Sequence, residues 1–103
     1  MLKPPSQFSP SPSGDAQLLA LDHELAGEKA ASLGRAGRRV EETLAKLRAH
    51  DAGSPERPAL LKDAAEAVYA YFIQRELCGM RRHHEVVREY AIPAAVLARL
   101  GAR

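Results

Sequence analysis

The sixteen residues CGMRRHHEVVREYAIP, at positions 78–93, hold the residue types best suited to chemistry in this sequence. A thiolate at Cys78 and the imidazoles of His83 and His84 are ligands that Zn²⁺ accepts. A thiol beside an imidazole is also a pair used in nucleophilic catalysis. The arginines of the same stretch suit phosphate groups. The stretch therefore raises three hypotheses: a metal site, a thiol-dependent enzyme, or a surface that binds nucleic acid.

The metal and thiol hypotheses lack supporting residues. On a helix, His83 falls in one row with Val86 and Tyr90, whereas His84 projects about 100° away, so the two imidazoles cannot chelate one ion. Cys78 stands at the end of a predicted helix, where the negative end of the dipole disfavours a thiolate. We expect a packed His83, a buried Cys78 and a solvated His84. The sequence predicts no metal, no cofactor and no catalytic residue, and an activity around Cys78 and His83 is the third-ranked hypothesis.

Two arginine clusters make nucleic-acid binding the second-ranked hypothesis. They are Arg35, Arg38 and Arg39 on the first helix, and Arg81 and Arg82 at the start of the third. The turn between the second and third helices also resembles a helix-turn-helix connection. Against this, Glu85 follows Arg81 by four residues, so a helix would pair their charges. The last helix, PAAVLARLG, offers only Arg99 to a base. The net charge of +2, from 15 basic and 13 acidic residues, adds little attraction.

The candidate interaction surface consists of exposed polar residues for which the sequence reveals no structural role. The competing interpretation is that these residues only solvate helix faces. They are Arg35, Arg38, Arg39, Arg81, Arg82 and His84.

Two long helices must position these residues. Asp15 is a suitable N-cap for a helix that continues to about His50. After Gly53, Ser54 caps a second helix with Pro55 at its first position, and this helix continues to about Cys78. We expect the two helices to form an antiparallel hairpin in which the first is longer.

Two short helices follow, and a tail precedes the hairpin. The third helix covers about residues 81–90, and the fourth is opened by Pro93 and closed by Gly101. Residues 1–14 are rich in proline and serine and predict a disordered tail, which leaves 15–103 as a single domain. Because no segment alternates as a strand does, the predicted class is all-α.

The first helix carries an apolar seam that repeats every seven residues. Its middle is small, with Gly37 on the seam and Gly34 beside it. Each glycine costs a helix about 1 kcal/mol relative to alanine, so we expect a neighbouring helix to approach closely there. The alternative is a break of the helix at LGRAG. The seam consists of Leu19, His23, Ala26, Ala30, Leu33, Gly37, Val40, Leu44 and Leu47.

The second helix predicts a homodimer. Its first face includes Leu61, Ala64, Ala65, Val68 and Phe72, and its second half adds Tyr69, Ile73 and Leu77. A helix that is apolar on two sides must be covered from two directions. A chain of 103 residues has little else to cover it. We therefore expect the long helices of two copies to pack together, as a dimeric helical bundle.

The remaining features indicate a cytoplasmic protein. A single cysteine excludes an internal disulfide, which is typical of a reducing compartment. No apolar stretch is long enough to cross a membrane, and the N-terminus lacks the apolar core of a secretory signal.

Two segments resemble a small family of bacterial proteins catalogued only as a domain of unknown function. They are EKAASLGRAGRRVEETLAKLRAHD and AAEAVYAYFIQRELCGMRRHHEVVREYAIPAAVLARLG. The resemblance covers about residues 20–101 and implies no reaction, ligand or catalytic residue. It does not choose between the three hypotheses. From the residue patterns themselves, we expect a non-enzymatic module that binds another protein and acts as a homodimer.

Overall fold

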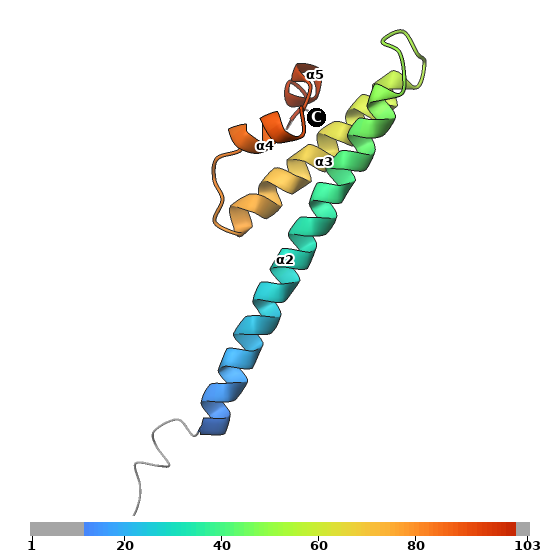
Figure 1. The fold of residues 1–103 in the computed structure, drawn as a ribbon. Coiled ribbons are helices and arrows are strands. Elements are labelled where there is room, and N and C mark those ends of the chain that lie inside the picture. Colours follow the sequence, from blue (N-terminus) through green and yellow to red (C-terminus); the bar gives the residue numbers. More distant parts are fainter. Residues whose placement is uncertain (1–11, 101–103) are drawn as a thin grey trace, which may run out of the picture. The chain divides into compact units, whose positions relative to one another are not determined.

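The computed structural model describes the backbone of residues 12–100 and the side chains of residues 14–100. All regular structure in this range is helical, as predicted, and consists of one long helix followed by shorter ones (Figure 1). The chain divides into two compact units, residues 1–31 and 32–103. The predicted tail lies outside the described residues up to position 11. The helices are α2 (Pro12–Arg48), α3 (Arg57–Leu77), α4 (His84–Glu89) and α5 (Ala94–Leu97).

Helix α2 begins earlier than predicted and does not break. It starts at Pro12, so Asp15 lies in its first turn, where a carboxylate favours the helix dipole, and is not the N-cap. The helix continues through Gly34 and Gly37 to Arg48, which excludes the break at LGRAG. Within residues 12–100, no helix combines the length and apolarity needed to cross a membrane.

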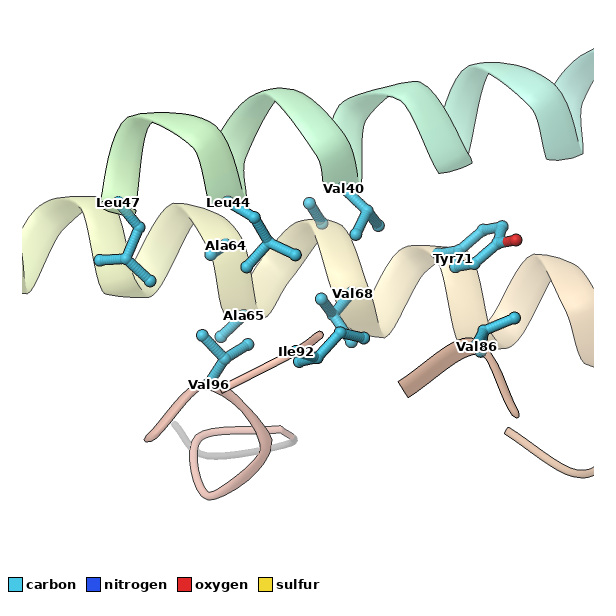
Figure 2. Close-up of a cluster of buried hydrophobic side chains, with 11 residues drawn as sticks. Val40, Leu44, Leu47, Ala64, Ala65, Val68, Tyr71, Val86, Ile92 and Val96 are labelled. Carbon is cyan, nitrogen blue, oxygen red and sulfur yellow. The ribbon is translucent and has the colours of Figure 1, made fainter. Parts of the chain in front are cut away.

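The core of the second unit lies where residues 32–48 of α2 pack against α3 and the C-terminal segment. Figure 2 shows Leu44 and Leu47 directed from α2 towards α3, with Val96 reaching the same cluster from α5. Large apolar side chains with almost no exposed surface anchor this cluster, as packed cores require. The buried apolar residues are Val40, Leu44, Leu47, Ala64, Ala65, Ala67, Val68, Tyr71, Val86, Ile92 and Val96.

Only the second half of the predicted seam is buried. Val40, Leu44 and Leu47 are buried, and Leu33 packs against them half-exposed. Every described side chain from position 15 to 31 is exposed. The heptad pattern therefore identified a core-facing stripe along residues 33–47, whereas its earlier members are exposed.

Gly37 is closely approached, but not by the backbone of a neighbouring helix as its position on the seam predicted. A Cβ atom there would lie 3.1 Å from the Tyr90 hydroxyl oxygen and 3.4 Å from Tyr71 Cε1. The neighbours are therefore two tyrosine side chains and not the backbone of a helix. Gly34 is exposed, and a Cβ there would meet only the Arg38 side chain of the same helix.

The connection between α2 and α3 is held by polar contacts. Arg57 donates hydrogen bonds to the carbonyl oxygens of Leu47 and His50, which satisfies the end of α2. Helix α3 starts at Arg57, later than the predicted Pro55, with Pro58 in its first turn. Ser54 does not cap the helix end by the predicted geometry, but its hydroxyl hydrogen-bonds the Glu56 carboxylate.

The Ser54 hydroxyl also affects the carboxyl group of Glu56. The Ser54 hydroxyl donates to Glu56 Oε1 over 2.5 Å, and the backbone N–H of Glu56 lies 3.3 Å from the Ser54 oxygen. The hydrogen bond from Ser54, followed by one from its own backbone, lowers the pKa of the Glu56 carboxyl. The carboxylate form therefore stabilises this turn.

Helices α3 and α4 end in the same hydrogen-bond pattern. At the end of α3, Met80 N–H donates to Arg75 O and Gly79 N–H to Glu76 O, and Gly79 has φ of 88°. This is the Schellman motif, and it confirms Gly79 as the predicted stop. At the end of α4 the same pattern places Ala91 at φ of 51°, a conformation that glycine normally occupies.

Helix α4 is shorter than the sequence predicts. It begins at His84, so Arg81 and Arg82 precede it and His83 is its N-cap. Helix α5 follows Pro93 as predicted, and Gly101 lies outside the described residues. Residues 81–83 are instead held by contacts from α3, which override their helical periodicity.

Candidate interaction surface

A groove in the second unit collects two of the six candidate residues. It has a volume of about 400 Å³. Arg35 and Arg39 stand one turn apart on α2, and Glu66 and Gln74 come from α3. Small residues complete its lining. These are Ser32, Ala36, Ala67 and Ala70.

The charges in this groove are unpaired within the described chain. Neither Arg35 nor Arg39 lies within ion-pairing distance of a carboxylate, and the ion pair found among residues 14–100 lies elsewhere. The groove thus has two guanidinium groups and one carboxylate, from Glu66, all available to a ligand. Alanine methyl groups let a backbone approach closely. The chemistry suits an extended or helical peptide with more acid than base on the contacting side.

An apolar row lies next to the groove on α3. Tyr69, Ile73 and Leu77 are 45%, 38% and 65% exposed. Each lies three residues after a residue that lines the groove: Tyr69 after Glu66, Ile73 after Ala70 and Leu77 after Gln74. Residues three apart are neighbours on a helix surface. The second apolar stripe predicted for this helix is therefore present, and it is exposed within the part of the chain that the structure describes.

The other candidate residues do not join the groove. Arg38 is exposed on α2 and does not line it. Arg81 and Arg82 are exposed in the segment before α4, and His84 is exposed at its start, as predicted for His84. The predicted pairing of Arg81 with Glu85 within one helix is wrong, because Arg81 lies outside α4.

His83 sits in a polar cluster that the sequence did not predict. Arg75 Nε donates to His83 Nδ1 over 3.1 Å, and His83 Nε2 lies 2.9 Å from Glu76 Oε2. The imidazole also stacks on Phe72, with ring centres 4.1 Å apart and planes within 3°. An Arg75 donor at Nδ1 fits the tautomer that carries its proton on Nε2, from which the ring donates to Glu76.

This cluster has a structural role. Arg75 also donates to the Arg82 carbonyl over 2.8 Å, so it fixes the turn between α3 and α4 at two points. His83 is packed, as expected, although through Phe72 and the end of α3. Arg75 and Glu76 both bind the segment that precedes α4.

Cys78 and the histidines do not assemble into a metal site. Cys78 is half-buried at the C-cap of α3, more exposed than the predicted buried thiol. Among residues 14–100, no group of three or more His, Cys, Asp or Glu side chains could hold a metal ion. His50 contacts the Lys46 carbonyl at 2.9 Å, which is the helix-end position the sequence indicated.

Two tyrosines join α3 to the C-cap of α4. The rings of Tyr71 and Tyr90 meet edge to face, with centroids 5.7 Å apart. Burial, and then the hydrogen bond with the Tyr71 side chain, raise the pKa of the Tyr90 phenol to about 12. Arg48 donates from Nη2 to the carbonyl oxygens of Tyr90 and Ala91 over 2.7 and 3.0 Å. These contacts fix the end of α4 against α2.

Sequence reasoning missed the α3 side of the groove. Glu66 and Gln74 lie eight residues apart on one helix face, but they carry no motif. Their position opposite Arg35 and Arg39 depends on the register between two helices, which the sequence does not encode in a readable pattern. The exposed row of Tyr69, Ile73 and Leu77 was readable because its spacing of four residues is regular.

The fold and this surface define a small all-helical protein with an open groove between two helices. The chain belongs to DUF6665, a family of unknown function whose model matches residues 11–103. The match confirms the resemblance noted from the sequence and extends it at both ends. No curated protein and no solved structure is detectably similar to the chain.

Proposed function

We propose that this protein is a non-enzymatic, cytoplasmic interaction module that acts as a homodimer. Its binding surface is the groove together with the apolar row of Tyr69, Ile73 and Leu77. The observation that carries the proposal is the exposure of this row directly beside the groove. An amphipathic helix that lies in a groove uses both kinds of contact, apolar anchors in the middle and charges at the edge.

The size of the chain supports a partner. A domain of this length buries only about 60–65% of its unfolded surface, so additional burial by association has a large effect on its stability. Three large apolar side chains in one row are a reserve for such burial. Full burial of an exposed Leu or Ile contributes about 1.5–3 kcal/mol, and these three side chains still expose between 38% and 65% of their surface.

Nucleic-acid binding remains the alternative, and one observation favours it. Arg81 and Arg82 are exposed and lack the neutralising partner that a longer α4 would have provided. Under this alternative the protein would bind duplex DNA with an affinity that falls steeply as salt rises. Such binding, unaffected by substitutions in the apolar row, would replace the proposed function.

Replacing Ile73 with glutamate tests the proposed function. Native mass spectrometry of the wild-type protein should give twice the chain mass of 11.2 kDa. Ile73→Glu should weaken the dimer at least about tenfold, because a carboxylate buried without a partner is costly.

The matched control is Ala45→Glu, which adds the same charge at an exposed position of α2 outside the groove. This variant should remain dimeric. A wild-type monomer, or a dimer that Ile73→Glu leaves intact, would contradict the proposal.

A further inference from the structure

The first part of α2 is a helix that requires a partner. Every described side chain of residues 15–31 is exposed. Four leucines are among them, and their exposed fractions lie between 48% and 63%; they are Leu18, Leu19, Leu21 and Leu25. A helical segment of about this length is only marginally stable in water without tertiary packing.

The charge of this segment is opposite to that of the groove. Between positions 12 and 31 the sequence has Asp15, Asp22, Glu24 and Glu28 against a single Lys29. The groove contains Arg35 and Arg39, both unpaired, against one glutamate. An acidic helix with exposed leucines is therefore the kind of ligand that the groove and the neighbouring apolar row would accept.

The spacing of the charges also matches. Glu24 and Glu28 stand four residues apart, and so do Arg35 and Arg39. Antiparallel helices would place Glu24 opposite Arg39 and Glu28 opposite Arg35 at the same time. Leu21 and Leu25 form the row beside these glutamates, because each precedes one of them by three residues. That row would lie over the alanine floor of the groove.

The groove that receives this segment must belong to another chain. The segment and the groove residues Ser32, Arg35 and Arg39 are parts of one uninterrupted helix, α2. A helix cannot fold back onto its own next two turns. We propose that residues 12–31 of each copy dock in the groove of a second copy, with Glu24 on Arg39 and Glu28 on Arg35. Exchange of the two segments is reciprocal, as a twofold dimer requires.

This inference rests on the proposed homodimer and names the contact that forms it. Its test uses two full-length variants. Glu24→Arg with Glu28→Arg makes the segment basic and leaves the groove basic. Arg35→Glu with Arg39→Glu makes the groove acidic and leaves the segment acidic. Each variant alone should be monomeric by native mass spectrometry, with at least a hundredfold higher dissociation constant than the wild-type dimer.

The mixture of the two variants provides the decisive measurement. Both segments then meet grooves of opposite charge, so the equimolar mixture should form a heterodimer whose mass is the sum of the two chains. Recovery of the complex also shows that both variants are folded. The control, Arg81→Glu with Arg82→Glu, makes the same charge change outside the groove and should stay dimeric.

The outcomes separate this inference from the proposed function. If the charge variants remain dimers alone while Ile73→Glu does not, the homodimer is retained and the docking of residues 12–31 is wrong. If the variants are monomeric and their mixture stays monomeric, the docking is also wrong. A wild-type protein that is monomeric throughout would overturn both.

Discussion

Single residues in this protein show how tertiary contacts assign roles that residue type alone leaves open. The sequence placed His83 on an apolar row, and the ring is packed, but on Phe72 and between Arg75 and Glu76. Arg35, Arg38 and Arg39 are all exposed charges for which the sequence reveals no structural role. Arg35 and Arg39 line the groove, and Arg38 does not. Residue type predicted exposure, whereas the groove depended on which residues of α3 lie opposite.

Tyr90 gives a prediction at the residue scale. Its phenol has a pKa of about 12 in the folded protein, compared with about 10 for a free tyrosine. Because the folded state holds the proton more tightly, the stabilisation from Tyr90 is complete below about pH 10 and is lost as the pH rises towards 12. Absorbance titration of tyrosinate should show an ionisation near pH 12 that Tyr90→Phe removes.

Thermal unfolding provides the second readout for Tyr90. The wild-type protein should lose more stability than Tyr90→Phe when the pH is raised from 10 to 12. Equal losses in the two proteins, or a late ionisation that persists without the Tyr90 hydroxyl, would show that burial against Tyr71 does not control this phenol.

At the scale of elements, helix ends were predictable where one residue decides them. Gly79 ends α3 because a positive φ is required there, and the sequence identified it. The predicted start of α4 at Arg81 is wrong, because Arg75 binds the Arg82 carbonyl and fixes residues 81–83 outside the helix. The predicted start of α3 at Pro55 is wrong, because Pro58 suits a first helical turn equally well and the helix begins at Arg57. Competition between such signals is settled by packing.

The two Schellman motifs give a prediction at this scale. Gly79→Ala should cost about 1 kcal/mol, because an L residue at positive φ is strained even though a Cβ there would meet no atom within 4 Å. Ala91→Gly should relieve the same strain and stabilise by a few tenths to about 1 kcal/mol, after the greater chain entropy of glycine is subtracted. Urea unfolding measures both changes.

Gly53→Ala is the matched control for these substitutions. Gly53 also has open space around its Cβ position, but its φ is outside the left-handed region. Its replacement should therefore cost far less than that of Gly79. Similar costs at the two glycines, or a destabilised Ala91→Gly variant, would contradict the role assigned to the left-handed conformation.

At the scale of the whole molecule, burial is unevenly distributed along the long helix α2. The all-helical class and the long first helix followed by shorter helices were predictable from periodicity. The seam of nine positions, however, gave no indication that only its second half would be buried. Periodicity reports that a face is apolar, and it does not report which chain covers that face.

Hydrogen exchange tests this uneven burial. At concentrations where the protein is monomeric, amides of residues 15–31 should exchange much faster than those of residues 40–47, which include buried core positions. Raising the concentration into the dimeric range should slow exchange in residues 15–31 by at least about tenfold. Equal protection in both segments of the dilute protein would show that residues 15–31 are stabilised within a single chain.

The position of Val96 in the core has a consequence for biosynthesis. This side chain is fully buried in a cluster whose other members include Val68 and Leu44, which precede it by 28 and 52 positions. During translation the leucines of α2 therefore emerge from the ribosome before the last core residue, and they stay exposed to water until it follows. The core is therefore complete only after Val96 has been synthesised, and until then part of its apolar surface stays exposed to aggregation or to capture by a chaperone.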